Sequence, residues 1–262
     1  MPVLNCVPIW VISKLQRKAF VLNYHTARDW DRFASSRLVQ SLLKRTERIV
    51  VPSTFLATKF GEIGVTTFVV PNTIDEGRFK YRPRNLLRPT AICTRNLGPD
   101  YGIDVVIEAF AIVLQHHPSA KLYLIGDGPL RNKLESLVHG LGLSGHVQFC
   151  GAMPNEKVAE WYERADIFVN ASFLDNSPLS ILEAMSSGVP VVTTAAGGIS
   201  SMVRHEGTGL LCPVGNARAL AEQVMRLLRE PELARNIAHR AHHELAAHRW
   251  VSVRQKWLEV YG

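Results

Sequence analysis

The chain has 262 residues, of which 47% are hydrophobic and 20% charged, so it can bury one large core or two modest ones like an ordinary soluble globular protein. Its formal net charge of +7 includes local basic groups, among them the segment 78–95, and indicates surfaces that attract anions. No nucleic-acid recognition motif or interleaved stacking aromatic accompanies these groups, so we expect no nucleic-acid partner.

The start of the chain carries no targeting or membrane-spanning pattern. The apolar stretch 4–12 is interrupted by Asn5 and Pro8, is too short to span a bilayer and follows no basic residue. The chain has four cysteines: Cys6, Cys93, Cys150 and Cys212. They are scattered without the C-x-x-C spacing of zinc sites or a disulfide framework, which favours the reducing cytosol.

Short apolar runs alternate with helical patterns along nearly the whole chain, which indicates βαβ units and parallel sheets. The predicted strands are 20–24, 48–51, 67–70, 90–94, 121–125, 146–150, 167–170 and 190–194. The predicted helices include 103–115, 129–140, 155–164, 178–187, 217–229 and 232–246. We therefore predict an α/β fold with two parallel-sheet halves.

A stretch without clear periodicity separates these halves, and its basic residues and proline place a linker at 77–88. The expected domains are a first half at 1–76, a second half at 89–246 and a returning helix at 247–262. Only three predicted strands precede the linker, whereas a doubly wound half usually has about five or six. We therefore expect the second half to be complete and the first incomplete, with its start lost or supplied by a separate chain and an unpaired edge on strand 20–24.

Two carboxylates lie eight positions apart across a predicted loop-to-helix junction, at Asp175 and Glu183. Pro178 suits the first turn of the helix, and Ser177 can cap it. Glu183 should then lie on the helix just inside its start, while Asp175 lies on the loop that approaches it. Two acids therefore flank the start of one helix.

The amides near Leu179 and Ser180 lie at this helix start, which is a ready-made site for an anion such as phosphate. Phosphate and carboxylate repel each other, so each acid is expected to accept hydrogen bonds from hydroxyl groups on either side of a phosphorylated ligand. Sugar hydroxyls meet that need. An exposed helix can also carry a lone acid without any function.

The run 173–198 resembles the signature of the family 4 retaining glycosyltransferases: Glu, seven residues, Glu, then Ala-Met and a Gly-x-Pro-Val-Val strand that leads to Gly-Gly. In this chain the first Glu is Asp175, followed by Asn176 and Pro178, and the strand leads to Gly197 and Gly198. The resemblance implies the GT-B fold of two Rossmann-like halves, with the donor nucleotide sugar bound by the second and a final helix at 250–261 that returns to brace the first. It also places Asn176, Pro178, Gly197 and Gly198 among the substrate-binding residues.

Arg95 closes the first strand of the second half, at the sheet edge where open α/β folds bind ligands. Its planar fork can hold two phosphate oxygens. In the family, an Arg here is followed six positions on by a Lys, and both cations neutralise the leaving diphosphate. Tyr101 occupies the position of that Lys and brings no charge. The alternative is that Arg95 is a surface charge at a strand end.

The turn at Gly126 and Gly128 resembles the family's Gly-x-Gly-Pro segment, which approaches a flat ligand closely, although most such triplets are simple turns. The segment that ends at Cys150 and Gly151 resembles the family's Val-x-Phe-x-Gly segment. The match implies that main-chain groups from Cys150 to Met153 hold the nucleotide base.

His25 follows a predicted strand of the first half, and its family counterpart is a His in the cleft that binds the donor sugar or phosphate. A capping or buried structural histidine is an equally open interpretation. His243 and His248 are five positions apart, not the four that a zinc helix needs, so we expect a solvated helix surface and no metal site.

The sequence as a whole predicts a retaining glycosyltransferase that needs no metal or other cofactor and uses a UDP- or GDP-sugar donor. The resemblance implies that Glu183 binds the ribose hydroxyls, Asp175 the sugar hydroxyls, Arg95 the diphosphate and His25 the sugar edge. A noncatalytic nucleotide-sugar-binding remnant and a sugar-nucleotide epimerase remain alternatives. We expect a glycan, lipid or small-molecule acceptor, and a cytoplasmic location with weak peripheral association with acidic membrane as a further hypothesis.

Overall fold

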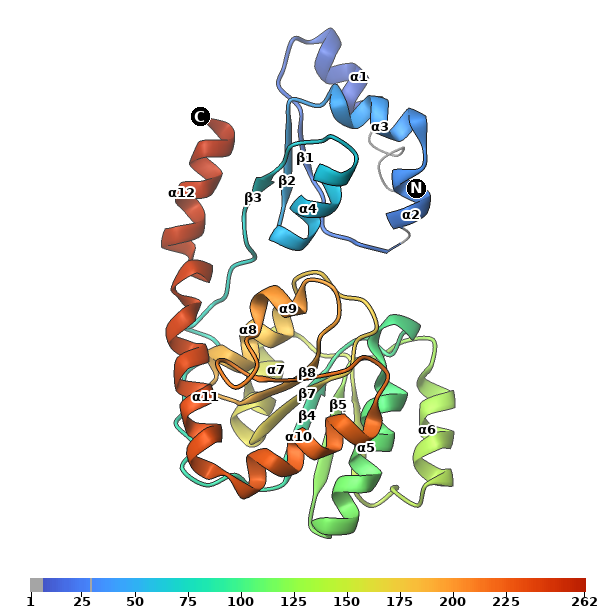
Figure 1. Cartoon of the computed structure of the whole chain (residues 1–262), viewed down its shortest axis with the longest axis vertical. Helices are drawn as coiled ribbons and strands as arrows, with labels where there is room; N and C mark the ends of the chain where they lie inside the picture. The colour runs from blue at the N-terminus through green and yellow to red at the C-terminus, as the bar shows by residue number, and fades with distance from the viewer. Residues whose placement is uncertain (1–6, 29) are drawn as a thin grey trace.

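A computed structural model of the chain describes residues 7–28 and 30–262. It shows two α/β halves stacked along the long axis, with helix α12 running along one side from the second half to the first (Figure 1). The beginning of the apolar stretch 4–12 and Cys6 lie outside the described residues. No helix in the described part of the chain is both long and apolar enough to cross a membrane.

The first half holds three parallel strands in the order β1-β2-β3 within its described residues. Its elements are α1 (Val7–Leu15), β1 (Val21–Asn23), α2 (Trp30–Ala34), α3 (Arg37–Lys44), β2 (Arg48–Val51), α4 (Thr54–Glu62) and β3 (Phe68–Val69). An aromatic cluster fills its core at Tyr24, Trp30, Phe33 and Phe60. β1 and β3 are shorter than the predicted 20–24 and 67–70, although Tyr24 still donates its amide to the carbonyl of Val50.

The second half holds six parallel strands in the order β6-β5-β4-β7-β8-β9, counted within the described residues. Its strands are β4 (Thr90–Thr94), β5 (Lys121–Ile125), β6 (Val147–Gly151), β7 (Ile167–Asn170), β8 (Val191–Thr194) and β9 (Leu210–Cys212). Its α-helices are α5 (Ile103–His116), α6 (Arg131–Gly140), α7 (Asn155–Arg164), α8 (Leu179–Ser186), α9 (Ile199–Met202), α10 (Ala217–Arg229) and α11 (Pro231–Glu244). The 3-10 helices η2 (Pro99–Tyr101) and η3 (Leu245–His248) and the final helix α12 (Trp250–Tyr261) complete the chain.

Helices cover both faces of this sheet. The core on one face includes the buried side of α5 and α10, and the core on the other includes residues of α7, α8 and α11. From β4 the chain adds β5 and β6 on one side and β7, β8 and β9 on the other. The order of the strands therefore reverses between β4 and β7, which is where doubly wound sheets bind ligands.

Several predicted helices begin or end one or two residues away from their predicted limits. The helix predicted at 129–140 begins at Arg131, because the amide of Leu130 is bonded to the carbonyl of Leu97. The helix predicted at 232–246 ends at Glu244 and continues as η3. The helix predicted at 178–187 spans Leu179–Ser186, which changes its capping as described below.

The arginines of the linker are mostly used within the protein rather than presented to anions. Arg84 is 6% exposed and donates to the main-chain carbonyls of Tyr162, Ala165 and Ser187. Burial lowers the pKa of Arg84 to about 10. Arg84 also pairs with the carboxylate of Asp166, as do Arg82 and Arg88. The expectation that the basic group at 78–95 attracts anions was therefore wrong for Arg84, whose donors are bound by buried acceptors, whereas Arg82 and Arg88 pair with Asp166 but remain 45% and 63% exposed.

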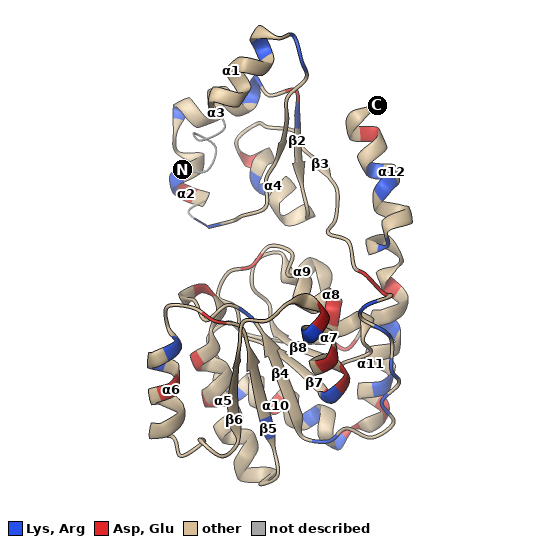
Figure 2. Ribbon diagram, turned by 180° about the vertical axis from the view of Figure 1, so that it is seen from behind, with Lys and Arg blue, Asp and Glu red and all other residues tan. Residues whose placement is uncertain are grey.

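α12 joins the two halves by packing on the first sheet. Its buried Val253 and Val260 cluster with Val50 of β2 and with Val70. Arg48 of β2 donates a hydrogen bond to the carbonyl of Val260. Lys and Arg side chains are spread over both halves, including α12 (Figure 2).

Candidate functional site

A cavity of about 660 Å³ opens between the two halves at the strand reversal of the second sheet. This volume is in the usual range of small-molecule sites. Ten residues that the sequence predicts for the site line this cavity: His25, Arg95, Tyr101, Gly126, Met153, Asp175, Asn176, Leu179, Ser180 and Glu183. Six predicted site residues do not line it: Gly128, Cys150, Gly151, Pro178, Gly197 and Gly198.

The start of α8 faces this cavity through Leu179 and Ser180. The predicted cap was wrong: the N-cap is Pro178, with an extended ψ of 121°, and within the described residues no side chain caps the helix. Ser177 stands one position too early, and its carbonyl accepts a hydrogen bond from Asn72 instead. The first amides of a helix have no acceptor within it, so the uncapped start remains a site for an anion.

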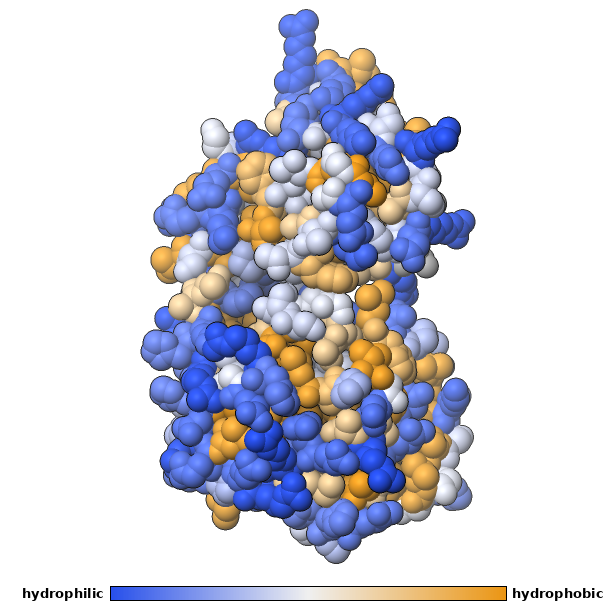
Figure 3. Space-filling model, viewed as in Figure 1, coloured by the Kyte–Doolittle hydropathy of each residue, from blue (hydrophilic) through white to orange (hydrophobic). Residues whose placement is uncertain are grey.

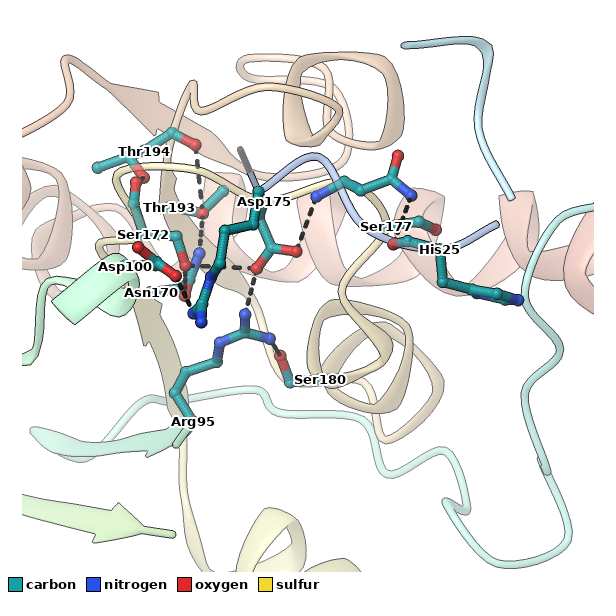
Figure 4. Close-up of polar contacts among 12 residues, drawn as sticks. His25, Arg95, Asp100, Asn170, Ser172, Asp175, Ser177, Ser180, Thr193 and Thr194 are labelled. Carbon is teal, nitrogen blue, oxygen red and sulfur yellow. Dashed lines mark hydrogen bonds and ion pairs between the residues drawn. The ribbon is translucent and has the colours of Figure 1, made fainter. Parts of the chain in front are cut away.

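Arg95 is held at the end of β4 by groups on three sides. Its guanidinium lies 4.4 Å from the centre of the Tyr101 ring and donates to the hydroxyl of Ser180 over 3.2 Å. It also forms an ion pair with Asp175 (Figure 4). Its Nε atom is buried and has no hydrogen-bond partner in the described part of the chain. Tyr101, in the place of a second cation, therefore supplies a flat surface for the first.

Asp175 and Arg95 are 13% and 10% exposed, so this ion pair is largely withdrawn from water. The other oxygen of Asp175 accepts the amide of Asn176 over 2.8 Å, and Ser172 lies 3.4 Å from the paired oxygen. The resemblance implied separate partners for the two groups, diphosphate for Arg95 and sugar for Asp175. In the structure they bind each other, so a ligand between them must share or replace this contact.

Glu183 lies one turn into α8, where its carboxylate accepts a hydrogen bond from Tyr162 over 3.1 Å. Burial raises the pKa of Glu183, and the hydrogen bond from Tyr162 and the charge of Arg95 oppose that rise. Glu183 still borders the cavity. The carboxylate of Glu183 can therefore accept hydrogen bonds in a position with little water, where such bonds are stronger than in bulk solvent.

Asn176 connects the halves rather than presenting its amide to the cavity. Its oxygen accepts a hydrogen bond from Ser53, and its nitrogen donates to the main-chain carbonyl of His25 over 3.3 Å. Both polar groups of its side chain therefore have protein partners. Asn176 was predicted as a substrate-binding residue, and the structure gives it a bridging position.

His25 lies at the edge of the cavity, and its ring points away from the pair of Arg95 and Asp175 (Figure 4). Partial burial lowers its pKa. An imidazole that is neutral at pH 7 can either donate or accept a hydrogen bond. The alternative of a fully buried structural histidine does not hold, because the side chain is exposed to the cleft.

The predicted glycines serve close contacts between segments of the chain. A Cβ on Gly126 would lie 2.1 Å from the carbonyl oxygen of Arg95, and one on Gly128 would lie 2.7 Å from that of Leu97. In the same way, a Cβ on Gly197 or Gly198 would lie 2.3 or 1.9 Å from the carbonyl oxygen of Asp175 or Asn176, respectively. Because these glycines have no Cβ, the turns that contain them can pack closely against the segments that carry Arg95 and Asp175.

Only part of the segment that was predicted to hold the base borders the cavity. Met153 and Ala152 line the cavity, whereas Cys150 and Gly151 do not. Gly151 instead accepts the amide of Gly126 with its carbonyl, over 2.9 Å, which joins β6 to the turn after β5. Burial raises the pKa of Cys150, so its thiol stays protonated at neutral pH.

Several lining residues were missed by the sequence analysis: Pro52, Asn72, Thr94, Asn96, Ile125, Asp127, Asn155 and Val158. Thr94, Asn96, Ile125 and Asp127 directly follow or end strands that the sequence identified, so the rule that ligands bind at carboxyl ends of strands could have found them. Pro52 and Asn72 come from the first half, and no local pattern marks them. Within the described residues, no group of three or more His, Cys, Asp or Glu side chains is placed to hold a metal ion.

The family described as Glycosyl transferases group 1 matches residues 78–244. This chain belongs to the group 1 glycosyltransferases. The match covers all six strands of the second sheet and the segments that carry Arg95, Asp175 and Glu183.

Two relatives show how much of a longer protein this group 1 chain corresponds to. It is 32% identical over 226 residues to the exopolysaccharide phosphotransferase SCO2592 of Streptomyces coelicolor, an alignment that covers 85% of this chain and 23% of that protein. It is 29% identical over 218 residues to the GDP-mannose-dependent alpha-(1-6)-phosphatidylinositol monomannoside mannosyltransferase of Mycobacterium tuberculosis, covering 77% of this chain and 55% of that protein. The chain thus spans about a quarter and about half of the lengths of these relatives.

The fold agrees with that of a solved structure. The crystal structure of Anabaena Alr3699/HepE in complex with UDP superposes with a TM-score of 0.86 at 23% identity, covering 96% of this chain and 74% of that one. The predicted α/β fold of GT-B type, with parallel sheets in two halves, is confirmed.

Proposed function

We propose that this chain transfers a sugar from a nucleotide diphosphate sugar to an acceptor hydroxyl, with retention of configuration as its resemblance to family 4 implies. In this reaction the bond from the anomeric carbon to the diphosphate oxygen breaks and a bond to the acceptor oxygen forms. The acceptor proton is released, and the diphosphate leaves with the bonding electrons. The protein must therefore stabilise negative charge on the diphosphate.

One observation carries this proposal: a single cavity holds a buried guanidinium, an uncapped helix start and a carboxylate one turn along that helix. Arg95 and the amides of Leu179 and Ser180 suit the diphosphate, since each supplies a donor to an anion. Glu183 accepts the ribose hydroxyls, and Asp175 accepts sugar hydroxyls beside Arg95. One preorganised donor at a developing negative charge can lower the activation free energy by about 2.7–4 kcal/mol.

We assign the nucleotide base to the part of the cavity that is lined by Met153, Ala152, Asp127 and Asn155. The solved HepE structures contain UDP or UDP-glucose, and the Mycobacterium tuberculosis relative is named for GDP-mannose. We therefore extend the proposal to a UDP- or GDP-sugar donor, with no metal or other cofactor. His25 is assigned to the sugar edge from the side of the first half.

Calorimetry with UDP and with GDP tests donor binding, and incubation with labelled UDP-glucose and GDP-mannose tests turnover, each with and without a glycan or lipid acceptor. A submillimolar dissociation constant for one nucleotide, and transfer that requires an acceptor, are expected. No binding of either nucleotide would contradict the assignment of the site. Formation of an isomer without any acceptor would instead indicate an epimerase.

A noncatalytic nucleotide-sugar-binding protein is the second candidate, and the small first sheet favours it. Within the described residues, β1 pairs only with β2, and the first half lines the cavity with just His25, Pro52 and Asn72. This candidate predicts nucleotide binding without transfer to any acceptor in the same incubation.

We also propose weak peripheral binding to acidic membrane from the cytoplasmic side. Helix α1 lies at the outer end of the first half (Figure 1), and its Ile9, Ile12 and Leu15 are 60%, 52% and 79% exposed. At that end of the molecule Figure 3 shows hydrophobic beside hydrophilic surface. Lys14 belongs to the same helix, and Lys18 follows it, so charge and apolar contact coincide. Flotation should recover the protein with phosphatidylglycerol vesicles at low salt and not with neutral phosphatidylcholine vesicles; equal recovery with both would contradict the charge contribution.

A further inference from the structure

Tyr162 of α7 has a buried hydroxyl group that touches three parts of the candidate site. Its oxygen lies 2.6 Å from Thr94 Oγ1, 3.0 Å from the carbonyl of Ser180 and 3.1 Å from Glu183 Oε2. The side chain is 0% exposed, so water does not compete for these contacts. Tyr162 does not line the cavity.

These partners belong to the two elements that present charge to the cavity. Thr94 ends β4 directly before Arg95, and Ser180 and Glu183 lie on α8. Ser180 also receives a hydrogen bond from Arg95 through its own hydroxyl. One buried oxygen therefore fixes the spacing between the strand that carries the cation and the helix that carries the acid.

The ring and the hydroxyl of Tyr162 have separable tasks. The ring packs in the core, with centroids 5.7 Å from Phe79 and 6.1 Å from Phe168, and phenylalanine would fill the same space. The hydroxyl adds one proton, which the Ser180 carbonyl and the Glu183 carboxylate share, and the hydroxyl of Thr94 can donate to its oxygen. Packing alone does not require that donor.

We propose that Tyr162 is a positioning residue of the nucleotide-diphosphate site, which orients the Glu183 carboxylate and fixes its distance from Arg95. This inference rests on the proposed function, because it assigns Glu183 to the hydroxyl groups of the donor. An ionised carboxylate accepts hydrogen bonds from ribose hydroxyls, whereas a protonated one has lost part of that capacity. The hydrogen bond from Tyr162 lowers the pKa of Glu183 against the effect of burial, in the direction that the site needs.

The test is the pH dependence of UDP and GDP binding by the full chain carrying Tyr162→Phe. We expect affinity at pH 7 to fall about 10-fold, and the midpoint at which acid abolishes binding to move to higher pH, because Glu183 protonates more readily. A purely structural tyrosine would lower the melting temperature without moving that midpoint. Tyr123→Phe is the matched control, since the Tyr123 ring packs on Trp161 and its hydroxyl has no hydrogen bond in the described part of the chain.

Two further variants keep the inference falsifiable. Thr94→Val removes the donor to the Tyr162 oxygen and should shift the midpoint in the same direction but less, even if Tyr162→Phe folds poorly. In a Glu183→Gln background, Tyr162→Phe should leave the pH profile unchanged. Wild-type affinity and midpoint in Tyr162→Phe, or a shift that persists without Glu183, would overturn the inference alone. A wild-type chain that binds neither nucleotide overturns the proposed function and this inference with it.

Discussion

The proposed function assigns diphosphate recognition to Arg95, whose side chain is only 10% exposed and whose position is fixed by Asp175, Ser180 and Tyr101. Arg95→Gln keeps some hydrogen bonding but removes the charge, and a hydrogen bond to a charged group is worth roughly 1.5–3 kcal/mol. We expect UDP or GDP to bind about 10- to 100-fold more weakly, while the weak binding of uridine or guanosine stays unchanged.

The comparison of nucleotide with nucleoside isolates the diphosphate contact in this prediction. Arg226→Gln is a suitable control, because Arg226 pairs with Glu206 and Glu230 on the surface and does not border the cavity. Equal losses for UDP and uridine in Arg95→Gln would show that the substitution disturbs the whole pocket rather than phosphate binding.

Glu183 shows opposite requirements for stability and for binding. Since its pKa is raised in the folded chain, ionised Glu183 disfavours folding at pH values above the pKa of the unfolded chain. Glu183→Gln should therefore raise the free energy of unfolding at pH 7, and this gain should vanish once acid protonates the carboxyl in both states. The same substitution should weaken UDP or GDP binding at least 10-fold. Thermal unfolding from pH 4 to pH 8 measures the expected gain in stability, and calorimetry measures the expected loss of nucleotide affinity. A Glu183→Gln chain that is less stable than wild type at pH 7 would contradict this prediction.

At the scale of elements, the loop that carries Asp175 is fixed by the glycines that follow β8. Gly198→Ala would place a Cβ 1.9 Å from the carbonyl oxygen of Asn176, at a φ of −74° that alanine adopts freely, so the effect is contact alone. We expect a loss of about 1–3 kcal/mol in the free energy of unfolding together with weaker UDP or GDP binding.

The control for that substitution lies in α4. A Cβ on Gly61 would meet nothing within 4 Å, and alanine favours a helix over glycine, so Gly61→Ala should stabilise the chain by roughly 0.5–1 kcal/mol. Urea unfolding of the two variants decides the matter. If Gly198→Ala unfolds at the wild-type midpoint, the loop is not held by this contact.

The sequence predicts elements well where a single physical cause dominates. β2, β4, β5 and β7 have the predicted limits, because each has a run of mostly buried apolar residues at its centre. β9 was not predicted, although its buried Leu210 and Cys212 are apolar. The N-cap of α8 was predicted wrongly because Pro178 has an extended ψ of 121° and stands just before the helix rather than in its first turn.

For the molecule as a whole, sequence motifs locate the charged groups of the second half but not how they pair. Arg95 and Asp175 are 80 positions apart, and nothing in the sequence near either residue indicates that they bind each other. Tyr162 shows no motif of its own and looks like an ordinary core aromatic. The links between halves through Asn176, Asn72 and α12 likewise depend on how two separately folded sheets meet.

Asn176 gives the sharpest test of that link, because it is 6% exposed and bonds from the second half to Ser53 and His25, which both belong to the first. Asn176→Asp keeps the shape and the bond from Ser53, but an ionised carboxylate cannot donate to the carbonyl of His25 and repels Asp175. We expect the variant to lose at least about 1–3 kcal/mol at pH 7. The protonated acid can donate again, so the loss should shrink as the pH falls through the pKa of the new carboxyl.

Calorimetric melting of Asn176→Asp and wild type at matched pH measures this difference, and small-angle X-ray scattering reports whether the halves move apart at pH 7. Asn132→Asp on the exposed surface of α6 serves as the control and should show a small difference without that pH dependence. Because the bridge to His25 sets where the first half meets the cavity, nucleotide affinity should follow the same pH profile as stability. A stable Asn176→Asp chain at pH 7 with wild-type affinity would mean that the other links, among them Asn72 and α12, set the distance between the halves.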